Sequence, residues 1–423
     1  MLVRSIGEQR LREGQMSQLL KLQRELEIAR LRTDRLFSLM SADGLYERPI
    51  PERNRLIFYL GHLEAFDWNQ LCRWTLEIPS FHESFDQLFE AGIDPSDGNL
   101  PSDQPSDWPT VTEVRGYSAQ VRKEIDRVLA SVPEWIVHIA VEHRLMHAET
   151  NAYLFHHLKA KHKHVPSDSY PVSTISFSEA VPKNEMIEVP EGMATLGRQA
   201  EEGFGWDNEF GQHEVPVPPF LISRYKVTNQ QYLRFVQEGG EPSAFWVKRG
   251  GAWYVRTMFQ EVPLPEFWPV YVTHRQAQAY ANWVGMTLPT EVQFHRAAFG
   301  TPSGIERSFP WGDEAPMVQH GNMDSQAWDP VPVTAHPHGN SGFDVAQMVG
   351  NGWEWTSTLF HPFQGFSPLP TYPGYSARFF DQDHYVVKGG GPHTASRLLR
   401  RSFRNWFRQS YPYAHIGFRC VQS

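Results

Sequence analysis

The sequence predicts two domains of different fold class, an N-terminal helical bundle followed by a loop-rich α+β domain. The chain has 423 residues, enough for two domains that each bury their own core. From residue 6 to about residue 160, apolar residues recur at helical spacing, whereas the later part combines short β-like runs with frequent Trp and Gly. We therefore expect a boundary between residues 170 and 182, with the domains at 1–175 and 182–423.

Individual segments support this division. His143 and His147 lie in line with apolar Ile136, as expected for the inward face of an amphipathic helix. The segment AGIDPSDGNLPSDQPSDWPTVTEV is rich in Pro, Gly, Asp and Ser, which predicts a structured loop. In the second half, HRQAQAYANWVGM predicts a helix, while VPVPPFLISRYKVTN and YVVKGGGP predict short strands.

Composition excludes several classes of function. The chain has 39 basic and 48 acidic residues, a formal charge of -9, and no dense Lys/Arg block, so no nucleic-acid partner is expected. It lacks an apolar run of about 18 residues and a signal-peptide pattern, so no membrane span is expected. Two cysteines, Cys72 and Cys420, form no recognisable metal or disulfide pattern, which fits a reducing cytoplasm.

The stretch HRLMHAE is the clearest candidate for chemistry, because His143 and His147 stand four residues apart in it. On a helix this spacing puts both imidazoles on one face, about 6 Å apart, within reach of one cation. His62, in the apolar segment YLGHLEAFDWN, offers a third imidazole from another helix. Three neutral imidazoles that leave positions open suit Fe(II) and O2 better than a structural zinc ion. The alternative is that the histidines are hydrogen-bonded core residues.

Neighbouring ionisable residues receive other roles. Glu149 lies roughly 200° around the helix from His147, so it is expected to support or cap rather than to bind the metal. The segment also lacks the Glu of the HExxH pattern, which excludes a zinc protease of that type. Four further histidines are expected at a solvated helix end: His156, His157, His162 and His164.

These features resemble the non-haem iron sulfoxide synthases of ergothioneine biosynthesis. That family joins a DinB-like four-helix domain to a formylglycine-generating-enzyme-like domain of C-type-lectin type. The first half of this chain supplies GHLEAFDWN and EHRLMHAET, which match the family's iron-ligand segments. The second half supplies FGWDNE, MVGNGWEWT and SFRNWF in the family's order. The resemblance implies the same two-domain architecture here.

The resemblance also implies an enzyme that uses Fe(II) and O2 to form a C–S bond at the imidazole carbon of Nα-trimethylhistidine (hercynine), with sulfoxidation. Carried over, His62, His143 and His147 are the iron ligands. Tyr372 and Tyr375 match two active-site tyrosines of the family, and Tyr372 is assigned the catalytic role. Packing within a loop is the alternative for both tyrosines.

The same resemblance assigns the hercynine pocket. Asn405 and Trp406 match residues that line it, and an aromatic face suits a quaternary ammonium, which cannot donate hydrogen bonds. Met146 stands where a glutamine often touches the substrate imidazole. Phe407 stands where synthases that use γ-glutamylcysteine carry an aspartate for the ammonium group of the donor.

These differences from the family pattern suggest a smaller or uncharged sulfur or selenium donor, with two candidates. The long loop of the first domain is rich in aspartate and has no arginine to hold the carboxylates of γ-glutamylcysteine. Aspartates bind sugar hydroxyls well, so a selenosugar is slightly favoured, as in the selenoneine synthases, which share this two-domain build. Free cysteine is the alternative donor. The small-molecule substrates are thus hercynine and one of these donors, and the oligomeric state stays open.

Three other functions fit the sequence less well. Formylglycine-generating oxidases bind copper through a pair of cysteines, which the second domain lacks. A lectin-like binding protein without turnover leaves three histidines on two helices unexplained. A zinc-dependent thiol transferase is compatible with the histidines, since DinB-like bundles also hold zinc, but it leaves the tyrosines and the NW pair of the second domain unused.

Overall fold

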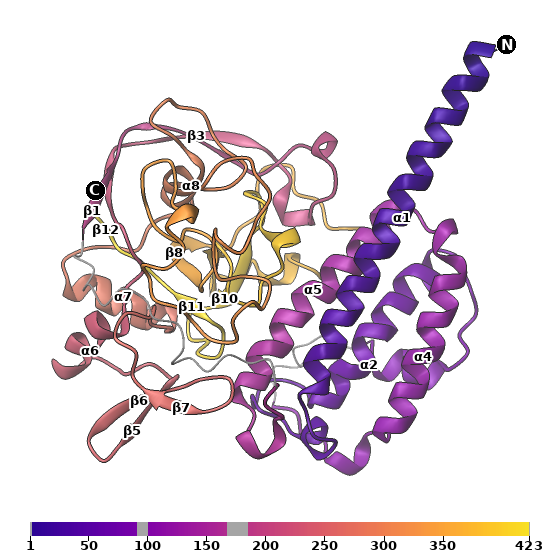
Figure 1. The fold of residues 1–423 in the computed structure, drawn as a ribbon, viewed down its shortest axis with the longest axis horizontal. Helices are drawn as coiled ribbons and strands as arrows, with labels where there is room; N and C mark the ends of the chain where they lie inside the picture. Colours follow the sequence, from indigo (N-terminus) through magenta and orange to yellow (C-terminus); the bar gives the residue numbers. More distant parts are fainter. Residues whose placement is uncertain (1, 91–99, 167–184, 423) are drawn as a thin grey trace. The chain divides into compact units, whose positions relative to one another are not determined.

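The computed structural model describes residues 2–90, 100–166 and 185–422, with the side chains of the first helix described from residue 18 onward. The chain divides into two compact units, Met1–Pro166 and Ser167–Ser423. The first unit is helical and the second contains the sheets (Figure 1). This confirms the expected fold class. The expected domain limits at 175 and 182 lie outside the described residues.

Four long helices build the first unit: α1 (Leu2–Ser38), α2 (Leu56–Asp67), α4 (Val111–Val128) and α5 (Glu134–His157). Helix α1 packs on α5, and α2 packs on both α4 and α5. A short helix α3 (Glu83–Leu88) and a π-helical turn (Trp68–Trp74) follow α2. Short 3-10 helices complete the unit at Asp43–Tyr46, Pro105–Asp107, Leu129–Ser131 and Ala160–His162.

The loop between α3 and α4 ends earlier than its composition predicts. Thr110 caps α4 by accepting a hydrogen bond from the backbone of Glu113, whose carboxylate in turn accepts one from the backbone of Thr110. Helix α4 therefore begins at Val111, within the segment expected to be loop. Residues 91–99 of this loop lie outside the described residues.

Helix α5 differs from its sequence-based description. It is buried on almost every side between Ile136 and His156, so it is a central helix and not the expected amphipathic one. The spacing of its apolar residues predicted a single inward face, because charged residues occupy the other faces of the helix. Those charges, above all Arg144, are buried and paired instead of solvated.

The helix end after α5 is also less solvated than expected. His156 and His162 are both buried, which contradicts the solvated-terminus interpretation for these two residues. The segment after α5 pairs with the end of α1 through an isolated bridge between Met40 and Lys163, and the Ser41 amide donates to the His162 carbonyl at 3.0 Å. His162 therefore lies in a segment that is paired with the end of α1.

The second unit contains several small sheets. One sheet has the order β1-β4-β12, and a second has the order β10-β9-β8-β11. The remaining strands form the pair β2-β3 and the antiparallel sheet β5-β6-β7. The bounds are β1 (Met186–Val189), β2 (Gly192–Leu196), β3 (His213–Val217), β4 (Phe220–Ser223), β5 (Trp246–Arg249), β6 (Ala252–Arg256), β7 (Glu261–Pro263), β8 (Trp353–Leu359), β9 (His384–Lys388), β10 (Asn405–Arg408), β11 (Ile416–Gly417) and β12 (Val421–Gln422).

Among its described residues, the second unit has three α-helices: α6 (Asn229–Gln237), α7 (His274–Trp283) and α8 (Glu291–Phe299). Each is preceded by a threonine that forms a capping box with a glutamine three residues later. Helix α7 confirms the helix expected from HRQAQAYANWVGM. Short 3-10 helices lie at Ala200–Glu202, Asp207–Glu209, Pro337–Gly339, Ala377–Phe379 and Ser396–Leu398. Within the described residues, no helix combines the length and apolar composition needed to cross a membrane.

Candidate metal centre

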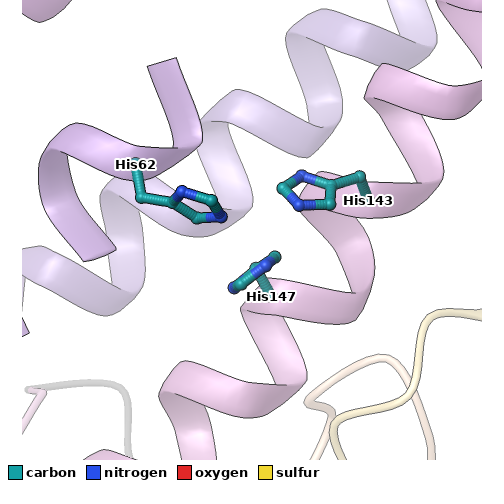
Figure 2. A group of neighbouring side chains, drawn as sticks. All are labelled: His62, His143 and His147. Atoms are coloured by element: carbon teal, nitrogen blue, oxygen red, sulfur yellow. The ribbon is translucent and has the colours of Figure 1, made fainter. Parts of the chain in front are cut away.

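Three histidines converge inside the helical unit. His62 comes from α2, and His143 and His147 come from successive turns of α5 (Figure 2). Each offers one ring nitrogen, and these three atoms lie within 4.8 Å of one another. All three side chains are buried. Across the described part of the chain, no other group of three metal-ligating side chains comes this close together.

Burial keeps these imidazoles neutral. Desolvation lowers the pKa of His62 to about 4, against the opposing effect of a hydrogen bond to the Phe89 backbone. The pKa values of His143 and His147 also lie well below the usual range, because burial and the neighbouring histidines disfavour the charged form. Since a metal binds the neutral imidazole, the site is ready for a cation at neutral pH.

Neighbouring groups orient the rings. Nδ1 of His62 lies 2.6 Å from the carbonyl oxygen of Phe89 and donates to it, which leaves Nε2 for a metal. Phe58 stacks on His62 with ring centroids 4.9 Å apart, and Phe66 stacks on His143 at 3.4 Å. Nδ1 of His147 is buried and has no hydrogen-bond partner among the described residues. Neutral, oriented imidazoles fit a divalent transition metal such as Fe(II).

The loop before α4 packs toward His62 through Trp108. The Trp108 ring lies 6.2 Å from the ring of Phe58 and 6.4 Å from that of Phe89. Its indole N–H donates to Asp103 at 2.7 Å. Asp103 is the centre of this loop, because Arg48 and Arg55 both pair with its carboxylate. This aspartate is therefore engaged in holding the loop.

The two tyrosines lie in the second unit. Tyr372 and Tyr375 are the first and last residues of a turn, in which the Tyr375 amide donates to the Tyr372 carbonyl at 3.2 Å. Their ring centroids are 5.9 Å apart. Burial raises the pKa of Tyr372 against the opposing effect of Arg378, and Asp207 adds to the rise, so the phenol is protonated at neutral pH.

Trp206 and Asp207, which are consecutive in the sequence, both contact the turn of the two tyrosines. The Trp206 ring stacks on Tyr375 with centroids 4.1 Å apart, and Asp207 accepts a hydrogen bond from Ser376 at 2.6 Å. Trp206, Asp207 and Ser376 are all buried. The sequence contains this segment as FGWDNE, but nothing in its composition assigned a role to Trp206 or Asp207.

The residues expected to line the hercynine pocket lie on strand β10. Trp406 contacts Tyr375 edge to face at 5.4 Å, and Phe360 covers one face of its indole at 4.2 Å. Asn405 precedes it and accepts a hydrogen bond from the Trp406 amide at 2.8 Å. Phe407 follows and stacks on Tyr411 at 5.3 Å. The structure thus brings Trp406 and the tyrosine turn together.

Two helical residues remain to be placed. Met146, one residue before His147, is half-buried on α5. Glu149 is also half-buried and does not belong to the group of metal-ligating side chains, as expected. The cysteines lie in different units, where burial raises the pKa of each thiol to about 12. No pair of thiolates is therefore present in the second unit.

Comparisons with known proteins cover nearly the whole chain. The DinB superfamily matches residues 25–150, and the sulfatase-modifying factor enzyme 1-like domain matches residues 162–423. Hercynine oxygenase of Mycolicibacterium smegmatis is 31% identical, over 90% of this chain and 94% of the relative. Hercynine oxygenase of Mycolicibacterium thermoresistibile is 32% identical, over 91% of both chains. Ergothioneine biosynthesis protein 1 of Neurospora crassa is 28% identical over 91% of this chain, which spans 55% of the fungal protein.

Proposed function

Because the chain belongs to the hercynine oxygenase family of ergothioneine-biosynthesis proteins, we propose that it is an enzyme that joins sulfur or selenium to hercynine with Fe(II) and O2. The observation that carries the proposal is the convergence of three buried, neutral histidines on one point of the helical unit. The proposed metal and the proposed reaction are inferred from this site and from the similarity to hercynine oxygenases.

His62, His143 and His147 are proposed to hold the iron. Three ligands from the protein leave coordination positions for small molecules, and the bound metal would supply the binding and reduction of O2. With a thiol donor the reaction balances as follows. The imidazole C–H and the thiol S–H are lost, a C–S bond forms, and O2 accepts four electrons as one oxygen enters the sulfoxide and the other leaves as water.

We propose that residues of the second unit bind hercynine and handle protons. Trp406 offers an aromatic surface to the trimethylammonium group, and Asn405 beside it offers an amide for hydrogen bonding. Tyr372 is proposed as the proton donor, since the raised pKa keeps its hydroxyl protonated, and Tyr375 as the residue that packs beside it. Met146 is proposed as a further substrate-binding residue, on its position one residue before His147 on α5.

For the donor we propose a selenosugar, with free cysteine as the alternative. Phe407 places an uncharged ring, stacked on Tyr411, where a carboxylate would be needed to pair with an ammonium group. Arg48 and Arg55 both pair with the Asp103 carboxylate, which engages their guanidinium groups and disfavours γ-glutamylcysteine. Because Asp103 holds the loop and Asp107 caps its 3-10 helix, hydroxyl recognition by loop aspartates depends on Asp94 and Asp97, which lie outside the described residues.

The test is an assay of the metal-free protein reloaded with Fe(II) under anaerobic conditions. Hercynine and O2 are supplied with a selenosugar, cysteine or γ-glutamylcysteine in parallel, and products are identified by mass. The proposal expects a hercynine adduct with the selenosugar. A cysteine adduct alone would overturn the donor assignment, and no adduct with any donor would overturn the function.

Two controls separate iron chemistry from the alternative of a zinc-dependent thiol transferase. Three neutral histidines also suit zinc, so the same assay is run after loading with Zn²⁺. Product that forms with Zn²⁺ and without O2 uptake would favour the transferase. His143→Ala should abolish both iron binding and product while the far-UV circular dichroism stays that of a folded protein, and full activity in this variant would remove the iron-site assignment.

A further inference from the structure

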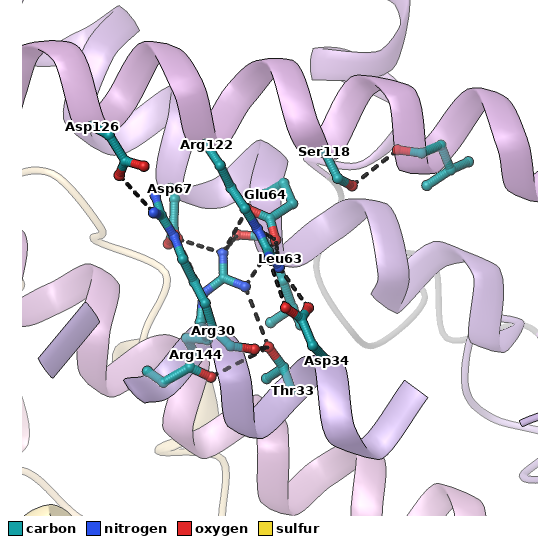
Figure 3. A network of polar contacts seen from close by, with 12 residues as sticks. Arg30, Thr33, Asp34, Leu63, Glu64, Asp67, Ser118, Arg122, Asp126 and Arg144 are labelled. Carbon is teal, nitrogen blue, oxygen red and sulfur yellow. Dashed lines mark hydrogen bonds and ion pairs between the residues drawn. The ribbon is translucent and has the colours of Figure 1, made fainter. Parts of the chain in front are cut away.

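A cluster of ion pairs, with buried pairs at its centre, lies in the helical unit that holds the three histidines (Figure 3). Its centre is Arg144, which follows His143 on α5 and is fully buried. Its guanidinium donates to Glu64 at 2.9 and 3.0 Å and to Asp67 at 2.5 and 3.1 Å. Both carboxylates belong to α2, the helix that carries His62. A guanidinium cannot lose its charge in a protein, so at this depth it requires such partners.

The same guanidinium also reaches the main chain of α2. Nη2 of Arg144 donates to the carbonyl oxygen of Leu63 at 3.0 Å. Leu63 directly follows His62, and Arg144 directly follows His143. The Arg144 side chain therefore links the residue that follows His143 on α5 with the backbone of the residue that follows His62 on α2.

The other arginines of the cluster make different connections. Arg122 of α4 shares Glu64 and pairs with Asp34 of α1 at 2.7 Å. Arg30 of α1 pairs with Asp126 of α4 at 2.6 Å. Neither belongs to α2 or α5, the two helices that carry the histidines. Arg144 is thus the arginine of this cluster that joins those two helices.

The distance between His62 and the other two histidines depends on how α2 packs against α5. A metal site loses affinity when the groups that support its ligands shift, typically by about 10-fold or more. We infer that Arg144 is a positioning residue for metal binding, whose contacts with Glu64, Asp67 and the Leu63 carbonyl hold α2 and α5 at the separation that lets the three histidines share one ion. The inference rests on the metal-binding part of the proposed function and is independent of the donor.

A residue that only stabilised the fold would behave differently. Its replacement would lower the unfolding temperature and leave the metal affinity of the folded protein unchanged. A positioning residue changes the affinity and the coordination geometry as well. The dissociation constant and the absorption spectrum of bound Co²⁺ report these two quantities without any need for turnover.

The test uses the full chain freed of metal and titrated with Co²⁺. Arg144→Lys keeps the positive charge but replaces the planar guanidinium fork by a single ammonium, which cannot reproduce the paired contacts with both Glu64 and Asp67. We expect this variant to bind Co²⁺ about 10-fold more weakly than the wild type, with an altered spectrum. Arg30→Met, which removes a buried arginine that joins α1 to α4, should bind with wild-type affinity.

A second variant covers the case in which Arg144→Lys does not fold. The triple change Arg144→Met, Glu64→Gln and Asp67→Asn removes the buried charges together, and it should show the same weakening. Wild-type affinity and spectrum in either folded variant would overturn the inference, as would equal weakening in Arg30→Met. A wild type that binds Co²⁺ through His143 but forms no product contradicts the proposed function alone, whereas Co²⁺ binding that survives His143→Ala contradicts both.

Discussion

Nδ1 of His62 lies 2.6 Å from the carbonyl oxygen of Phe89, a residue that comes after α3 and outside the ligand helices. The carbonyl accepts a hydrogen bond from the Nδ1–H group and so fixes which nitrogen faces the other histidines. The Phe89 ring packs against α2 at Gly61, where an added Cβ would lie 2.6 Å from the ring. The position of Phe89 therefore depends on a glycine inside a helix.

Gly61→Ala should weaken metal binding without removing any ligand. The new methyl group displaces Phe89 and with it the carbonyl that orients His62, so we expect a loss of about 10-fold in Co²⁺ affinity. Titration of the metal-free protein measures it. Gly116→Ala on α4 is the matched control, because an added Cβ meets nothing within 4 Å there. Unchanged Co²⁺ affinity in Gly61→Ala would show that Phe89 does not orient the ligand.

Ser376→Ala should slow turnover while metal affinity is retained. The change leaves the buried carboxylate of Asp207 without this hydroxyl donor and loosens the turn of Tyr372 and Tyr375, so we expect kcat to fall by about 10-fold, equivalent to about 1.4 kcal/mol. Steady-state kinetics with the preferred donor measure the fall. Ser243→Ala, which removes a buried hydroxyl that donates to the Tyr271 carbonyl, is the control. An equal fall in both variants would argue against a role for the turn.

Trp406→Ala should raise the KM for hercynine more than it lowers kcat. Loss of a cation–π contact of about 1 to 2 kcal/mol corresponds to roughly a 10-fold weaker interaction. Trp406→Phe should show a smaller rise, because Phe still offers an aromatic face. The KM for the donor and the Co²⁺ affinity serve as internal controls. If hercynine binds normally to Trp406→Ala, the ammonium group is held elsewhere.

The metal-free protein should lose stability as the pH falls from about 6.5 toward 4. His274 is buried against the ring of Tyr385, and burial lowers its pKa to about 4, below its value of 6.5 in the unfolded chain. As the pH falls, the unfolded chain therefore binds a proton at His274 before the folded protein does. With respect to this group, the free energy of unfolding has its full value above pH 6.5 and decreases as the pH falls toward 4.

Denaturant unfolding of His274→Phe and the wild type at pH 7 and pH 5 measures this effect. The wild type should lose about 2 kcal/mol more than the variant over this interval, since the variant cannot be protonated there. Phenylalanine keeps an aromatic ring against Tyr385, so the comparison isolates the charge. An equal loss in both proteins would mean that His274 is protonated without penalty in the folded state.

Much of the fold follows from local sequence patterns. The period of apolar residues predicted the helices around His62 and His143, and the helix beginning at His274 was also recognised. The burial of α5 was not predicted, because charged residues such as Arg144 and Glu142 are typical of a solvated helix face. Their burial depends on partners from other helices, such as Glu64 for Arg144, which the local sequence does not indicate. Sheet order was not predictable either, since β12 pairs with β4 from about 200 residues earlier and no short-range signal records that pairing.

The histidine site was predictable and its supports were not. The four-residue spacing of His143 and His147 carried the metal interpretation, the apolar segment YLGHLEAFDWN offered His62 as a third candidate, and the resemblance assigned all three as ligands. The Phe89 carbonyl belongs to the main chain, so the identity of the residue at this position does not indicate its role. The aspartates of the loop were expected as a group to bind sugar hydroxyls. Composition shows that the loop is acidic, but it does not show that Arg48 and Arg55 from outside the loop pair with Asp103.

The most direct test of the central claim follows the ring protons of hercynine by NMR during turnover by the Fe(II)-loaded protein with donor and O2. The account predicts that one imidazole C–H signal is lost in step with O2 uptake, while the trimethylammonium signal remains. If both ring C–H signals persist while O2 is consumed, or if the loss proceeds equally with Zn²⁺ under nitrogen, the protein does not form a carbon–sulfur or carbon–selenium bond by iron-dependent oxidation.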